Sequence, residues 1–166
     1  SHPEMGGGAI LDYIHEVNYC RWLFGNVKKV TAMTSSRSHL NIDVEDLAEL
    51  ILEMEDGTLC EIHVDYVQQP SSRSCKVVGD EGTIEWDLGR HTVEEYKLEE
   101  ERWKTHDLPD WNTNEMYVDE LSHFLSCVDS QQETICNLED GYRDLQVALA
   151  ALRSAEEEKH IKVDNI

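Results

Sequence analysis

The chain has 166 residues, 40% of them hydrophobic, with 35 acidic residues against 14 basic ones and a formal net charge of −21. This length suits one domain with a sizeable core. The charge argues against nucleic acids and anionic membranes as partners, because binding them needs a clustered positive field on the protein. No stretch approaches the ~18 consecutive apolar residues of a membrane span. The excess of acid fits either a self-repelling soluble surface or a high-salt environment.

Residues 1–5, Ser-His-Pro-Glu-Met, are interpreted as a remnant or a cut point, because the chain then begins abruptly at Gly6-Gly7-Gly8. A helix is predicted from Ala9 to Phe24, where Ile10, Ile14, Val17 and Leu23 are spaced to form a buried stripe. Gly25-Asn26 is typical of a helix C-cap and ends it.

The middle of the chain predicts seven strands joined by short turns as an antiparallel meander. Asp46–Met54 and Thr58–Val67 flank Asp56-Gly57, a strong hairpin signal. Alternation places Cys60, Ile62, Val64 and Tyr66 on a packed face, and Glu61, His63 and Asp65 on a wet or partner-covering face. The other predicted strands are Val27–Ser36, Ser74–Val78, Thr83–Leu88, Thr92–Leu98 and Arg102–Asp107.

Two helices are predicted to close the chain, Asn114–Val128 and Asp140–Glu158, with N-caps from Asp110–Asn114 and Asn137–Asp140. The order of helix, strands and helices predicts an α+β domain. We expect an open, mainly antiparallel sheet with helices packed on one face.

Cysteine and histidine spacing gives little sign of a metal site. The five cysteines form no C-x-x-C pair, and the histidines form no zinc-like cluster, so no metal site is predicted. No secretory signal is recognised, and the odd number of cysteines favours reduced thiols and a cytoplasmic location.

Asp12 and His15 form the main chemical candidate. They lie three apart on the first turns of a helix after a glycine run, so they share a face, and a carboxylate can orient an imidazole that exchanges a proton near neutral pH. This spacing alone also suits an ordinary polar helix face.

The wider string, with Gly6-Gly7-Gly8, Asp12, His15 and Trp22-Leu23-Phe24-Gly25, resembles a motif at the head of a substrate-domain helix in the Gfo/Idh/MocA oxidoreductases. The resemblance continues in family order over nearly the whole chain from Gly6. It includes the Glu45-Asp46 strand, the Asp56-Gly57 hairpin, Gly79 through Gly82 with Ile84 and Trp86, Asn114-Glu115-Met116-Tyr117, and Leu138-Glu139-Asp140-Gly141.

The resemblance implies the C-terminal domain of an NAD- or NADP-dependent oxidoreductase that acts on a hydroxyl of a sugar, sugar derivative or cyclitol. It implies that His15 serves or assists as acid/base and that Asp12 binds substrate or tunes the site. We expect substrate contacts from Glu16, Asn18 and Tyr19, and cofactor contacts from Gly7 and Gly8.

The resemblance also implies that residues 6–166 form one C-terminal substrate-binding and oligomerisation domain. Its first strand and helix, and the Rossmann domain with its Glu-Lys-Pro lysine, are expected to be missing. The chain contains neither Glu-Lys-Pro nor a G-x-G-x-x-G after a strand. We therefore expect no bound cofactor and no turnover by this segment alone.

Two departures from the family pattern affect the site. The spacing is D-x-x-H where D-x-x-x-H is commoner, and Asn18 stands where the family has an aspartate. Two other functions stay open: a non-catalytic scaffold that forms a homo-oligomer through the face carrying Glu61, His63 and Asp65, and a stand-alone small-molecule binder using the Gly6–His15 segment.

Overall fold

The computed structural model describes residues 6–107 and 112–165, which belong to two compact units. The first unit comprises residues up to Val67 and from Ile135 onward, and the second comprises Gln68–Thr134. The predictions for residues 1–5 and for Asp110 as a cap lie outside the described residues. The α+β class predicted from the sequence is confirmed.

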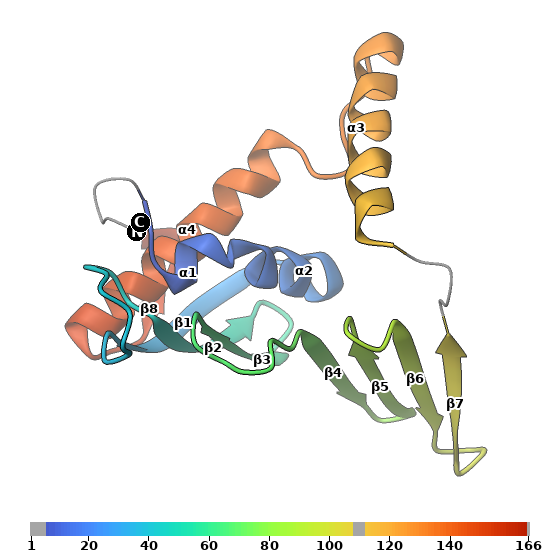
Figure 1. Ribbon diagram of the computed structural model, residues 1–166, viewed down its shortest axis with the longest axis horizontal. Coiled ribbons are helices and arrows are strands. Elements are labelled where there is room, and N and C mark those ends of the chain that lie inside the picture. Colours follow the sequence, from blue (N-terminus) through green and yellow to red (C-terminus); the bar gives the residue numbers. More distant parts are fainter. Residues whose placement is uncertain (1–5, 108–111, 166) are drawn as a thin grey trace. The chain divides into compact units, whose positions relative to one another are not determined.

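The first unit is a four-stranded antiparallel sheet with helices on one face (Figure 1). Its strands follow the order β3-β2-β1-β8. In chain order its elements are α1 (Ala9–Asp12), α2 (Ile14–Phe24), β1 (Val27–Ser35), β2 (Leu47–Met54), β3 (Leu59–Asp65), α4 (Leu138–Glu157), β8 (Ile161–Lys162) and the 3-10 turn η2 (Val163–Asn165).

Alternation along the strands builds the core of this unit. Leu50, Leu52 and Met54 of β2 are almost fully buried, and the predicted packed face of β3 is confirmed by Cys60, Ile62 and Val64. These side chains pack with small residues of α4, such as Ala148, Ala150 and Ala151. Burial of this apolar face is the main force that holds the three helices on the sheet.

Buried Ser154 ties α4 to the sheet through polar contacts. Its hydroxyl accepts from the Ala32 amide of β1 at 3.0 Å and donates to the Lys159 carbonyl at 2.6 Å. Because the side chain is 0% exposed, these two bonds satisfy a group that would otherwise destabilise the core.

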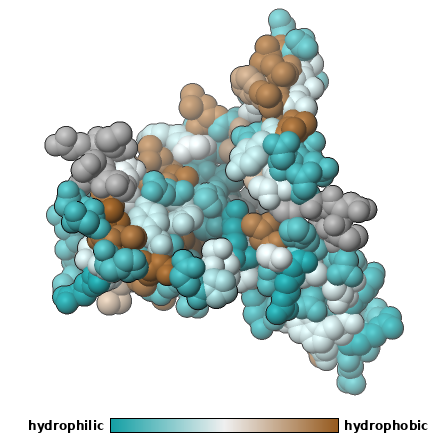
Figure 2. Space-filling view, viewed as in Figure 1, coloured by the Kyte–Doolittle hydropathy of each residue, from teal (hydrophilic) through white to brown (hydrophobic). Residues whose placement is uncertain are grey.

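The second unit contains a hairpin-linked sheet, with strand order β4-β5-β6-β7, and the helix α3. The elements are β4 (Ser74–Gly79), β5 (Gly82–Asp87), β6 (Thr92–Lys97), β7 (Arg102–Asp107) and α3 (Thr113–Ser130). Asn112 caps α3 by accepting from the Asn114 amide. Several large apolar side chains of α3 are exposed, and they give it the brown surface in Figure 2: Met116, Val118, Leu121, Phe124, Leu125 and Val128.

The structure departs from the predicted elements at three places. The strands form two sheets rather than one meander, because the segment between β3 and β4 contains Pro70 and continues neither ladder. The two-residue strand β8 was missed, since so short a strand shows no alternation. The first predicted helix is broken at Tyr13, which has non-helical angles and separates α1 from α2.

The predicted wet face of β3 is confirmed for Glu61 and His63, which are exposed. Asp65 departs from it, because its side chain is only 6% exposed. Its carboxylate accepts from the Val67 amide at 2.6 Å and lies 3.0 Å from His63 Nε2, so it closes the end of the strand instead of facing water.

Candidate functional site

Gly8 and Glu45 fix the start of the first helix pair. Gly8 is the N-cap of α1 with a φ of 129°, a conformation that few residues other than glycine adopt. A Cβ atom at this position would collide with the Glu45 carboxylate. Glu45 then satisfies the open helix end: its carbonyl accepts from the Ala9 amide at 3.1 Å and its Oε1 accepts from the Ile10 amide at 3.2 Å.

Tyr66 connects the end of β3 to this helix start. Its hydroxyl donates a short hydrogen bond to Asp12 Oδ2 and accepts from the Gly8 backbone amide. Burial raises the pKa of the Tyr66 hydroxyl, and the hydrogen bond and charge of Asp12 raise that pKa further. The hydroxyl therefore stays protonated at neutral pH and holds Asp12 as its acceptor.

His15 lies on the first turn of α2, and its side chain is 47% exposed. Its Nε2 lies 3.3 Å from Oε1 of Glu16. Glu16 is a buried residue, with 8% of its surface exposed. The Tyr13 ring meets the His15 ring edge-on with 5.8 Å between centroids, and its centroid is also 5.8 Å from that of Tyr66. His15 is thus a solvent-accessible imidazole beside a buried carboxylate and an aromatic pair.

Asp12 and His15 lie on two separate helices, whereas the sequence predicts one helical face for both. The helix break at Tyr13 means that they do not share one continuous helical face. Asp12 is bonded to Tyr66, and the carboxylate found beside the His15 imidazole is Glu16. The two predicted residues are linked through the rings of Tyr13 and Tyr66.

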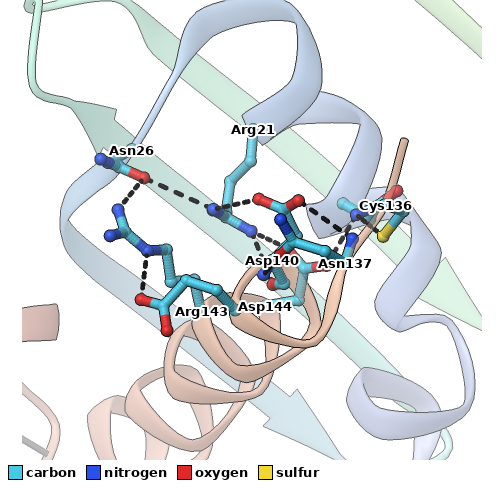
Figure 3. Close-up of polar contacts among 9 residues, drawn as sticks. Arg21, Asn26, Cys136, Asn137, Asp140, Arg143 and Asp144 are labelled. Carbon is cyan, nitrogen blue, oxygen red and sulfur yellow. Dashed lines mark hydrogen bonds and ion pairs between the residues drawn. The ribbon is translucent and has the colours of Figure 1, made fainter. Parts of the chain in front are cut away.

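A buried polar network anchors α2 to α4 (Figure 3). Arg21 donates a short hydrogen bond to Asp144 and a 2.9 Å bond to the Asp140 carbonyl. The side chains of Arg21 and Asp144 are 8% and 7% exposed, so the charge pair is enclosed. Asn137 begins α4 with a capping box and sets the position of these two aspartates.

Asn18, predicted to contact substrate, belongs to this network. Its amide donates to Asp144 Oδ2 at 2.7 Å and to Cys136 Sγ at 3.8 Å. Tyr19 packs against the hydrophobic core as a partly buried residue. Asn18 therefore contacts the polar network and Tyr19 contacts the core, and their predicted contact with substrate stays a prediction.

The predicted cofactor contacts of Gly7 and Gly8 also stay a prediction. The backbone amides of Gly8, Ala9 and Ile10 are engaged by Tyr66 and Glu45. A phosphate cradle at a helix start needs such amides to point at the ligand. Gly8 allows the chain to approach the Glu45 carboxylate closely.

Sequence reasoning missed Glu45 and the site role of Tyr66. Tyr66 was assigned to the packed face by alternation, although it follows the last residue of β3. Both residues reach the site across long sequence separations, so no local spacing could indicate them. The available signal was the position of Tyr66 at a strand end, where polar side chains often converge on a site.

A pocket of about 210 Å³ lies elsewhere in the first unit, beside the anchoring network. Its lining includes Arg21, Asn26, Glu55, Glu139 and Arg143, and excludes His15 and Asp12. Arg21 is paired with Asp144, and Arg143 donates to Glu139 and Asn26 at 3.0 Å each. Both guanidinium groups are thus paired within the protein, and the pocket is separate from the candidate site because its lining contains none of the site residues.

Residues 6–107 and 112–165 contain neither a metal-binding cluster nor a membrane-spanning helix. Within them, no three His, Cys, Asp or Glu residues are grouped to hold a metal ion. No helix in this part of the chain combines the length and apolar character needed to cross a membrane.

The amino-acid sequence matches a known protein family over almost the whole chain. Residues 1–163 match a family model described as "Oxidoreductase family, C-terminal alpha/beta domain". A comparison with curated protein sequences found no match.

Solved structures share the fold over about half of their own length. A levoglucosan dehydrogenase in complex with NADH and levoglucosan is 17% identical with a TM-score of 0.88, and the match covers 97% of this chain and 52% of that one. The aldose-aldose oxidoreductase of Caulobacter crescentus, complexed with glycerol, is 25% identical with a TM-score of 0.81, covering 95% and 48%. GenD2 from gentamicin A biosynthesis, in complex with NAD, is 27% identical with a TM-score of 0.78, covering 95% and 48%.

Proposed function

The chain belongs to the Gfo/Idh/MocA oxidoreductase family, as a C-terminal alpha/beta domain, and from this we propose that it forms the substrate side of a nicotinamide-dependent dehydrogenase. The proposed substrate is a hydroxyl group of a sugar, a sugar derivative or a cyclitol. Because the chain spans about half the length of the solved structures that it resembles, the proposed activity requires a cofactor domain.

The observation that carries the proposal is the exposed His15 imidazole beside Glu16, near the Asp12–Tyr66 pair. An imidazole can accept or return a hydroxyl proton near neutral pH, and a neighbouring carboxylate can orient its ring. The solved relatives with NADH and levoglucosan, with glycerol and with NAD support this reading by their ligands.

Each site residue has a role in the proposed reaction. His15 takes the proton from the substrate hydroxyl during oxidation and returns it during reduction, while a bound nicotinamide would accept or supply the hydride. Glu16 orients the imidazole, and Asp12, held by Tyr66, accepts hydrogen bonds from a neighbouring substrate hydroxyl. Three carboxylates, on Asp12, Glu16 and Glu45, lie around this helix start, so a neutral polyol suits the site better than a phosphorylated sugar.

In this proposal most contacts to the nicotinamide cofactor come from the cofactor domain. The amides of Gly8, Ala9 and Ile10 are engaged by Tyr66 and Glu45, so this proposal assigns the main phosphate contacts of the dinucleotide to the cofactor domain, and the predicted contacts of Gly7 and Gly8 stay a prediction. The choice between NAD and NADP belongs to that domain too. A cytoplasmic location, where the nicotinamide pools are found, is part of the same proposal.

The proposal is tested with the chain joined to its cofactor domain. NAD⁺ and NADP⁺ reduction is followed by absorbance with a panel of aldoses, amino sugars, inositols and matching sugar phosphates. We expect turnover of one class of neutral or amino polyol and weaker use of its phosphate. No nicotinamide reduction with any member, in either direction, would contradict the proposal.

A second candidate function is homo-oligomerisation through the open face of the β1–β3 sheet. That face exposes Met33, Ile51 and Leu59 at 75%, 53% and 69%, between charged neighbours such as Glu61 and His63. A second copy of the chain would cover these apolar side chains. Sedimentation equilibrium of the chain and of Ile51→Lys tests this: a monomer at high concentration for the unchanged chain removes the support.

A further inference from the structure

Two cysteines of the first unit meet inside the core and have no part in the proposed reaction. Cys20 lies on α2 and Cys60 on β3, and the residues are 7% and 8% exposed. Both belong to the same cluster of buried apolar residues, where α2 packs on β3. The Cys20 thiol hydrogen-bonds to Cys60, so the two side chains meet, and neither cysteine belongs to a disulfide.

The other three cysteines have different surroundings. Cys127 donates to the Glu133 carbonyl at 3.4 Å and contacts His123. Cys136 is exposed and accepts from the Asn18 amide. Cys75 is half-buried and belongs to the second unit. The pair on α2 and β3 is therefore chemically distinct within the chain.

We propose that Cys20 and Cys60 form a peroxide-sensitive dithiol, a modification site at which hydrogen peroxide or a small organic peroxide creates a disulfide linking α2 to β3. The site is independent of the proposed dehydrogenase activity. Because Cys20 and Cys60 are only 7% and 8% exposed as residues, the site suits an oxidant as small as a peroxide, and Cys136 is the exposed cysteine that a bulkier reagent would meet.

The chemistry takes two balanced steps. The Cys60 thiolate attacks one peroxide oxygen, the O–O bond breaks, and Cys60 becomes a sulfenic acid while the other oxygen takes up a proton and leaves as water. The Cys20 sulfur then attacks the Cys60 sulfur, the S–O bond breaks, and the hydroxyl leaves as a second water with the Cys20 proton. Two thiols are oxidised by two electrons, and one peroxide is reduced to two waters.

The local contacts support Cys60 as the first nucleophile. The hydrogen bond from Cys20 lowers the pKa of Cys60, and this effect outweighs burial and the nearby charge of Asp56, which both raise it. The same hydrogen bond aligns Cys20 for the second step. The resulting link would fix the middle of α2, the helix whose first turn carries His15.

The test uses the chain as it exists, under reducing-agent-free buffer with hydrogen peroxide. Intact-mass spectrometry is expected to show loss of two hydrogens, and thiol counting to show loss of two of the five cysteine thiols. Peptide mapping is expected to find a Cys20–Cys60 cross-link that a reductant reverses. The Cys136→Ser variant is the matched control and should form the same cross-link. In Cys20→Ser, the second step is blocked, so dimedone should trap a sulfenic acid at Cys60.

The unfolded chain supplies a control that does not depend on any variant folding. In concentrated urea the same peroxide treatment should give mixed pairings, because the native contact between Cys20 and Cys60 is lost. The proposal is overturned if the folded chain oxidises only at Cys136, Cys75 or Cys127. It is also overturned if its Cys20–Cys60 cross-link is no more abundant than in urea.

Discussion

Replacing Asp144 by alanine removes the anion that neutralises buried Arg21. Asp144 accepts from Arg21, as Figure 3 shows, and from the Asn18 amide. The substitution would leave a guanidinium group that is 8% exposed without its main partner. We expect this change to weaken the attachment of α2 to α4.

The size of the effect follows from burial. Removing one partner of a buried ion pair costs about 3–5 kcal/mol, because the remaining charge is neither solvated nor paired. Arg21 keeps the Asp140 carbonyl at 2.9 Å and the Asp140 carboxylate at 3.8 Å, which places the expected loss near the lower end, at about 3 kcal/mol. For a chain of this length, that loss corresponds to a fall in Tm of roughly 6–12 °C.

The assay is urea denaturation of the chain followed by far-UV circular dichroism, with thermal melting as a second measurement. Glu139→Ala is the matched control on the same helix, because its partner Arg143 and Glu139 itself are 43% and 63% exposed. An exposed pair of this kind contributes within about 0.5 kcal/mol. The double variant Arg21→Met, Asp144→Leu should recover part of the stability, since neither charge is then buried alone.

The reasoning is refuted if Asp144→Ala and Glu139→Ala unfold at the same urea concentration. It is also refuted if the double variant is less stable than Asp144→Ala, because an unpaired buried charge would then not be the cause of the loss.

Three further predictions concern two residues that hold the candidate site, Gly8 and Tyr66, and one ion-paired residue of the sheet, Glu53. Gly8→Ala should destabilise the chain by about 2–4 kcal/mol in urea unfolding, through backbone strain and displacement of Glu45. Tyr66→Phe should cost about 1 kcal/mol in the same assay, because Asp12 loses its donor. Two lysines of β1 lower the pKa of Glu53 from 4.5 to about 2, so ionised Glu53 stabilises the fold above pH 4.5 and this contribution disappears as the pH falls toward 2; melting curves of Glu53→Gln should change less over that range than those of the unchanged chain.

Each of these predictions has its own contradicting result. Gly6→Ala is the control for Gly8, because a Cβ at Gly6 meets open space at a φ of 72°, and equal losses in the two variants would contradict the close approach to Glu45. Unchanged stability of Tyr66→Phe would show that the hydrogen bond from Tyr66 to Asp12 does not stabilise the fold. Parallel pH profiles for the two proteins would remove Glu53 from the acid response.

Much of the fold could be predicted from the sequence because its signals are local. The alternation through Cys60, Ile62 and Val64 identified the buried face of β3, and Asp56-Gly57 located its hairpin. The caps Asn112 and Asn137 lie within the predicted polar segments. The division into two sheets and the strand β8 depend on pairing between distant segments, which periodicity does not report.

The candidate site was predictable only in part, for the same reason. His15 and Asp12 are predicted from their spacing and from the family motif around the glycine run. Their actual partners, Glu16 for His15 and Tyr66 for Asp12, depend on the helix break at Tyr13 and on a contact across 54 positions of sequence. Asn18 is predicted at the substrate because of its place in the motif, and the motif gives no sign of the hydrogen bond that its amide donates to Asp144.

The most direct test of the central claim is the activity of His15→Ala in the chain joined to its cofactor domain, with His63→Ala as the control on the open sheet face. With the best substrate of the panel, we expect kcat/KM of His15→Ala to fall by about 10²–10⁴-fold, as for loss of a general acid–base group, while His63→Ala keeps nearly full activity. A His15→Ala enzyme with unchanged kcat/KM and unchanged pH dependence would contradict the account.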